Sequence, residues 1–148
     1  MTSGATSEGG DRPRIVVGVD GSAGGTGALD WAVAEAERTG AVLDVHTVYA
    51  PGYVFVTAEE IQMAMDKVIE GAVERVAELA PSVPVGGTTH EGSAAAVLIE
   101  ASRGASLLVV GSRGGGGFAG LALGSVSQQC AQHAHCPVVI VHHGEQAA

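Results

Sequence analysis

The chain has 148 residues, of which 46% are apolar and only 3% aromatic, so the core of one domain must be built from Val, Ala, Leu and Ile. Its formal net charge is −9 and Lys67 is its single lysine, which disfavours nucleic acids and anionic membranes as partners. No apolar run approaches the roughly 20 residues of a membrane-spanning helix. Two cysteines, Cys130 and Cys136, do not make a disulfide framework. We therefore expect a cytoplasmic protein.

The chain is expected to form one domain between two tails. Residues 1–12 are rich in Ser, Thr and Gly and lack the basic start and apolar middle of a signal peptide, so we expect a disordered N-terminal tail. The domain is expected over residues 13–143, followed by a C-terminal tail at residues 144–148.

Short apolar runs alternate with helical patterns along this domain. The first helical pattern follows a glycine-containing turn at residues 20–25 and ends before Gly40, which stands where a C-cap belongs. This alternation predicts an α/β fold with a single doubly wound five-stranded parallel sheet. In chain order we expect strand 14–19, helix 26–39, strand 42–48, helix 58–79, a weaker strand 83–89, helix 94–103, strand 106–110, helix 125–134 and strand 137–141.

Two glycine-containing segments follow the fourth expected strand. Glycines let a backbone approach a ligand closely, and the unpaired N–H groups at a helix N-terminus favour an anion, so the pattern indicates a phosphate site. The hydroxyls of Ser125 and Ser127 either bind phosphate oxygens or cap the helix, and Arg113 either contacts phosphate or lies in solvent. The candidate phosphate-binding residues are Gly111, Ser112, Arg113, Gly114, Gly117, Gly124, Ser125, Val126 and Ser127.

The same residues carry a family resemblance. Gly111, Gly114 and Gly124-Ser125 reproduce the spacing G-x2-G-x9-G-[ST] of ATP-binding members of the universal stress protein family. Residues 15–22 resemble the first strand and turn of that family, and residues 136–141 resemble its last strand. The resemblance implies the adenine nucleotide alpha-hydrolase-like fold with strand order 3-2-1-4-5, ATP as ligand with or without Mg²⁺, and dimers.

This strand order places the first and fourth strands side by side, and ligands bind at the switch point that results. Gly18 and Asp20 lie there. In the resembling family an acid at the position of Asp20 lies near the ribose or near a cation bound with the phosphates; alternatively Asp20 forms an Asx-turn with Gly21 and Ser22. Val48 matches a position whose backbone reads the adenine edge in that family.

Residues 130–136 contain two cysteines and two histidines, which raises the question of a metal site. Cys130 and His133 would share a helix face, but the spacing matches no structural zinc pattern. We expect no metal ligands here.

Together with the glycine pattern, the resemblance therefore implies a nucleotide-dependent stress-response protein that binds ATP and is not an enzyme. The alternatives are a slow ATPase, a cyclic-AMP binder and a nucleotide-free dimer scaffold. A Walker-type lysine is missing, because Leu123 precedes Gly124-Ser125, so any hydrolysis should be weak. If the last strand lies at a sheet edge, Val138–Val141 would be open to pairing with a second copy, which predicts a homodimer.

Overall fold

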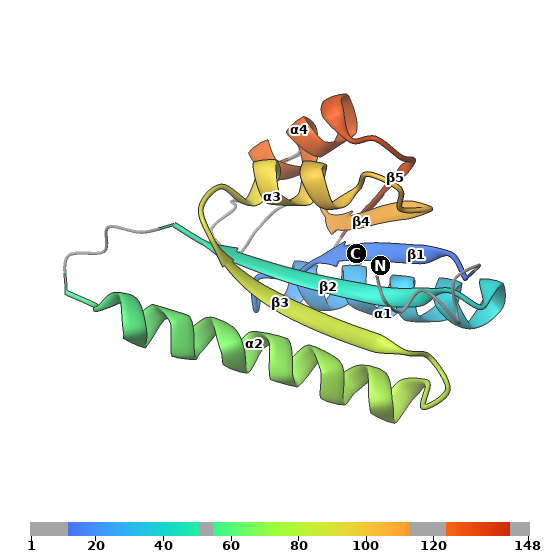
Figure 1. Cartoon of the computed structure of the whole chain (residues 1–148), viewed down its shortest axis with the longest axis horizontal. Helices are drawn as coiled ribbons and strands as arrows, with labels where there is room; N and C mark the ends of the chain where they lie inside the picture. The colour runs from blue at the N-terminus through green and yellow to red at the C-terminus, as the bar shows by residue number, and fades with distance from the viewer. Residues whose placement is uncertain (1–11, 51–54, 113–123, 143–148) are drawn as a thin grey trace.

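The computed structural model describes residues 12–50, 55–112 and 124–142, and the structural statements below concern these residues. They form a five-stranded parallel sheet of order β3-β2-β1-β4-β5 with helices on both faces (Figure 1), which confirms the predicted fold class and strand order. The elements are β1 (Arg14–Gly18), α1 (Ala23–Thr39), β2 (Val42–Tyr49), α2 (Ala58–Leu79), β3 (Val85–Glu91), α3 (Ala94–Ala101), β4 (Leu107–Gly111), α4 (Ser125–His133) and β5 (Val138–Val141).

The sheet separates two hydrophobic clusters. Helices α1 and α2 cover one face, and α3 and α4 cover the other face over β1 and β4 (Figure 1). Because side chains alternate along a strand, Ile15 and Val17 join the larger cluster with α1 and α2, whereas Val16 packs with Leu98 and Leu108 in the smaller one. The three strand residues are at most 1% exposed, which is typical of a central parallel strand.

Helix α1 begins at Ala23, three residues before the predicted start at Thr26. Ser22 is its N-cap, and the Ser22 side chain accepts a hydrogen bond from the Gly25 amide. Gly24 and Gly25, expected in a turn, are therefore helical and buried. A Cβ at Gly25 would lie 3.1 Å from the Asp20 nitrogen, so the first turn packs directly on the end of β1.

Smaller differences occur at other element ends. β3 runs from Val85 to Glu91 rather than from Val83, because the Val83 amide donates to the Ala80 carbonyl in the turn after α2. Helix α3 ends at Ala101, two residues early. None of the described helices has the length and apolar character that a bilayer crossing requires.

Candidate functional site

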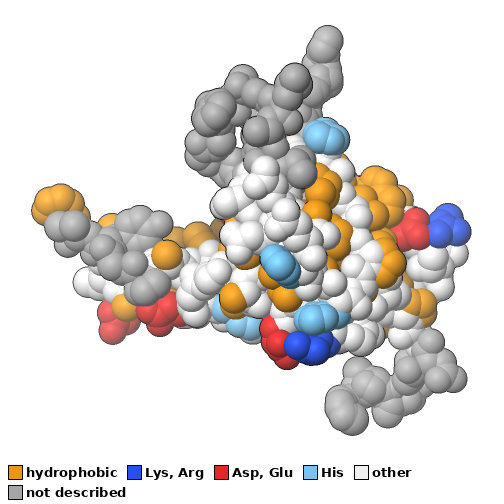
Figure 2. Space-filling view, turned by 90° about the horizontal axis from the view of Figure 1, so that it is seen from above, with side chains coloured by type: hydrophobic (Ala, Val, Ile, Leu, Met, Phe, Trp, Pro, Cys, Tyr) orange, Lys and Arg blue, Asp and Glu red, His pale blue; other side chains and the backbone are white. Residues whose placement is uncertain are grey.

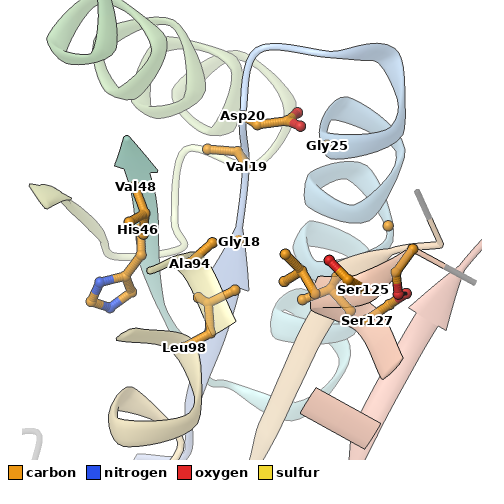
Figure 3. Close-up of a pocket in the computed structure, with 14 residues that line it drawn as sticks. Gly18, Val19, Asp20, Gly25, His46, Val48, Ala94, Leu98, Ser125 and Ser127 are labelled. Atoms are coloured by element: carbon orange, nitrogen blue, oxygen red, sulfur yellow. Dashed lines mark hydrogen bonds between the residues drawn. The ribbon is translucent and has the colours of Figure 1, made fainter. Parts of the chain in front are cut away.

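A cleft of about 240 Å³ opens at the carboxyl ends of β1 and β4 (Figure 3). This is the switch point of the sheet, because β2 and β3 lie on one side of β1 and β4 and β5 lie on the other. β1 and β4 pair directly, from Ile15 beside Leu107 to Val17 beside Val109. The helices that follow these two strands diverge to opposite faces, which leaves a crevice between them. The cleft is lined by Gly18, Val19, Asp20, Gly25, His46, Val48, Ala94, Leu98, Val110, Gly111, Gly124, Ser125, Val126 and Ser127.

Gly111 allows β4 to end directly against the start of α1. A Cβ at this position would lie 2.9 Å from the carbonyl oxygen of Gly24, a contact with backbone that no side-chain rotation can relieve. A glycine is required here by close approach, since its φ angle is not positive. The contact sets the width of the cleft between β4 and α1.

Hydrogen bonds tie Ser112 to the start of α4. The Ser112 carbonyl accepts from the Gly124 amide at 2.7 Å and from the Ser127 hydroxyl at 3.0 Å. The Ser127 Oγ also lies 3.0 Å from the Gly124 carbonyl, and the Ser112 amide donates to the Val141 carbonyl at 2.9 Å. These bonds hold residues 112 and 124 together; we call them the Ser112–Gly124–Ser127 clamp.

The clamp changes the roles expected for two serines. Ser127 is 2% exposed and its one hydroxyl proton is used by a carbonyl of the protein, so this hydroxyl does not donate to a ligand. Ser112 is 4% exposed, does not line the cleft, and has both backbone groups bonded internally. Both residues hold the site together.

The N-terminus of α4 supplies the anion-attracting end of the cleft. Gly124 is the N-cap and, having no side chain, makes no side-chain bond to the first turn. The first N–H groups of a helix have no acceptor within the helix and carry a partial positive charge, which favours anions. Ser125, the first helical residue, is exposed at the rim of the cleft with Val126 beside it.

Asp20 forms the Asx-turn that the sequence offered as one of its two roles. Its Oδ1 accepts hydrogen bonds from the Ser22 amide at 2.9 Å and from the Ser22 hydroxyl at 2.5 Å, as in an Asx-turn. Gly21 in this turn has φ +85°, which a glycine adopts without strain. Asp20 also lines the cleft, so the turn fixes a carboxylate at its edge.

His46 lines the end of the cleft beside Val48, and the sequence analysis did not single it out. It follows Asp44 at a spacing of two on β2, so a polar stripe inside an apparently apolar strand was the available signal. The His46 carbonyl accepts from the Val19 amide at 3.0 Å, which joins β2 to the switch point. Figure 3 shows the His46 imidazole turned away from Ser125 and Ser127, at the opposite side of the cleft.

Two of the ionisable groups around His46 have shifted pKa values. Burial opposes ionisation of Asp44, but the nearby His46 and Arg14 outweigh it and lower the pKa of the Asp44 carboxyl. For His90, burial and then the charge of His46 lower the pKa, against the attraction of Asp44. The region therefore favours an ionised Asp44 and a neutral His90.

The structure brings most of the predicted site residues together. Arg113, Gly114 and Gly117 lie outside the described residues, and Ser112 lies behind the cleft wall. The predicted residues that line the cleft are Gly18, Asp20, Val48, Gly111, Gly124, Ser125, Val126 and Ser127.

The two cysteines are not part of a metal-ligand cluster of described residues. Within the described part of the chain, no group of three or more His, Cys, Asp or Glu side chains is placed to hold a metal ion. Cys130 lies on the buried face of α4, and burial raises its thiol pKa to about 11. Burial raises the pKa of Cys136 as well. Burial therefore favours the protonated form of both thiols at neutral pH.

Comparison with known proteins decides the family. The sequence pattern of the universal stress protein family matches residues 12–142, nearly the whole domain. The chain belongs to the universal stress protein family. A universal stress protein of Mycolicibacterium smegmatis is 35% identical over 90% of this chain, and one of Mycobacterium tuberculosis is 33% identical over 96% of it. This universal stress protein spans about half the length of these relatives, covering 49% and 50% of them.

Solved structures agree with the family and the fold. A universal stress protein crystallised in complex with cAMP is 28% identical, with a TM-score of 0.72 over 89% of this chain and 98% of that one. The universal stress protein UspA from Lactobacillus plantarum has a TM-score of 0.74 at 22% identity, over 87% and 97% of the two chains, and shows the shared fold.

Proposed function

We propose that this universal stress protein binds an adenine nucleotide, ATP in the first place, in the cleft between β1 and β4. The observation that carries the proposal is the cleft itself, a crevice at the switch point with the N-terminus of α4 at one end. The 28% identical relative crystallised with cAMP supports an adenine nucleotide as the ligand class. Acting through this ligand, the protein would serve as a cytoplasmic regulator in a stress response.

The phosphates would lie at the N-terminus of α4. Backbone N–H groups of its first turn and the Ser125 hydroxyl face that end, and Gly111 and Gly124 leave room for close approach. Figure 2, which views the side of the sheet with α3 and α4, shows few charged side chains, with the visible Lys and Arg groups beside acidic ones. Backbone dipoles would therefore provide much of the attraction, since an anionic group at an exposed helix N-terminus gains about 0.3–1 kcal/mol.

The nucleoside would lie toward Val48, whose backbone would read the base edge. Asp20 at the edge of the cleft would face the ribose or a Mg²⁺ ion bound with the phosphates. Arg113, Gly114 and Gly117, which lie outside the described residues, are proposed to complete the phosphate site.

Binding without efficient hydrolysis is the proposed activity. The residues that line the cleft include no lysine to hold the transferred phosphate, and the first turn of α4 carries no carboxylate or imidazole to orient a water. The protein would thus hold ATP as a ligand, with slow hydrolysis at most.

Calorimetric titration with ATP, ADP and cyclic AMP, with and without Mg²⁺, tests the proposal. We expect saturable binding of ATP, and release of inorganic phosphate over hours at no more than a trace level. Tighter binding of cyclic AMP than of ATP would reassign the ligand. Absence of binding by all three would support a nucleotide-free scaffold, and rapid phosphate release would support an ATPase.

A homodimer through β5 is also proposed. β5 is an edge strand of the sheet, and all four of its residues, Val138–Val141, are only partly buried in the single chain. Such an apolar edge is open to pairing with another strand. We expect sedimentation velocity to show a dimer at micromolar concentration. A Val139→Lys substitution should shift it to monomer, whereas a wild-type monomer at that concentration would contradict the proposal.

A further inference from the structure

Two histidines form a direct pair at the end of the cleft opposite α4. His46 Nδ1 on β2 lies 2.8 Å from His90 Nε2 on β3, and the rings stack with centroids 5.0 Å apart and an interplanar angle of 22°. A contact this short needs one proton between the two nitrogens. Because two imidazolium rings would each present an N–H there, the pair holds at most one positive charge at this distance.

The second nitrogen of His46 faces a carboxylate. Nε2 is buried and lies 3.1 Å from Asp44 Oδ2, although it makes no well-aligned hydrogen bond within the described part of the chain. The Arg14 guanidinium fixes the carboxylate through a 2.9 Å bond to the same oxygen. Asp44 therefore stands beside His46 as an ionised partner, held in place from β1.

Among the described residues, few other charged groups lie near the pair. β1 contributes Arg14, which also donates to the carbonyls of Ala101 and Arg103. β2 contributes Asp44, β3 ends at Glu91 after His90, and the turn after β1 carries Asp20. Helix α3 presents the uncharged Ala94 and Leu98 to the cleft. One added proton on the pair is therefore a large change in the charge near the cleft.

We propose that the His46–His90 pair takes up one proton when an anionic nucleotide occupies the cleft, so that affinity for the nucleotide increases as the pH falls. The inference rests on the proposed function. An imidazolium in the wall attracts the anion, and linkage requires that the bound anion in turn favours protonation. Since His46 and the phosphate end lie on opposite sides of the cleft, the expected effect is modest, on the order of threefold in Kd.

Calorimetry with ATP at about pH 5.5 and pH 8.0, on either side of the ordinary imidazole range, measures this coupling. The Kd at pH 8.0 divided by the Kd at pH 5.5 should be about threefold larger in the wild type than in His46→Gln. Comparing the two proteins cancels the titration of ATP itself, because it is the same for both. Repeating the titration at about pH 6.5 in buffers of different ionisation enthalpy should show correspondingly less proton uptake in His46→Gln. His133→Gln, exposed at the end of α4, is the matched control and should behave as the wild type.

Two further measurements keep the test decisive. If His46→Gln does not fold, His90→Leu at the partly buried β3 position removes the other nitrogen of the pair and should also reduce the pH ratio. NMR titration of the ligand-free protein should show His90 titrating at higher pH once the charge of His46 is removed, and an unchanged His90 titration would overturn the shared proton. ATP binding with the same pH ratio in all variants would overturn the coupling alone. No ATP binding at either pH would overturn the proposed function and the coupling with it, while the NMR result would still stand.

Discussion

Replacing Ser125 by glutamate is expected to weaken ATP binding at least about tenfold without destabilising the fold. Ser125 is the first residue of α4 and is exposed at the rim of the cleft, so a longer side chain fits without collision. A carboxylate there would repel the phosphates by about 1 kcal/mol in water and about 4 kcal/mol near a protein surface for unit charges about 4 Å apart. The same carboxylate at a helix N-terminus stabilises the helix by about 0.3–1 kcal/mol.

Affinity and stability should therefore move in opposite directions, which no general damage to the protein would produce. Ser125→Gln adds nearly the same atoms without the charge and should retain most of the affinity. Gln129→Glu places a charge at another exposed position of α4 and serves as the second control. Calorimetry gives the Kd values and thermal unfolding gives the stabilities. Equal ATP affinity in Ser125→Glu and Ser125→Gln would argue against phosphates at this helix end.

Gly111→Ala is expected to destabilise the protein by about 1–3 kcal/mol, the usual range for overpacking. The added Cβ would lie 2.9 Å from the Gly24 carbonyl oxygen and 3.1 Å from the carbonyl carbon. Relief requires β4 or the first turn of α1 to move, so the walls of the cleft should shift and nucleotide affinity should fall as well.

Gly71→Ala provides the matched comparison. Gly71 lies inside α2, is exposed, and would place an added Cβ in open space. Alanine has the higher helix propensity, so this variant should gain about 0.5–1 kcal/mol. Urea unfolding of both variants measures the contrast. A neutral or stabilising Gly111→Ala would show that the close contact between β4 and α1 is unimportant.

Buried strands and amphipathic helices were predictable from local pattern. The run Leu107–Val110 has neighbours on both sides in the sheet and helices on both faces, so its sequence is continuously apolar. Helix α2 starts at Ala58 as expected, after a Thr57–Glu60 capping box. The strand order came from the family resemblance, because alternation alone does not fix which strands are neighbours.

The features that the sequence did not predict all depend on tertiary contacts. Gly24 and Gly25 have low helix propensity, yet both lie in the first turn of α1. Gly25 packs closely against the end of β1, and the Gly24 carbonyl packs closely against Gly111 at the end of β4. His46 was overlooked because its partner His90 lies on another strand, 44 residues further along the chain. The internal use of the Ser127 hydroxyl depends on Ser112, which is brought near by folding. Local patterns do not contain these pairings.

The Ser112–Gly124–Ser127 clamp has a consequence for how this protein could diversify. Its bonds set the positions of residues 112 and 124 independently of the residues between them. Insertions or deletions between these two anchors should therefore leave the rest of the nucleotide cleft in register. Evolution could then vary that stretch around the three residues proposed to complete the phosphate site, and so adapt the protein to a new partner protein.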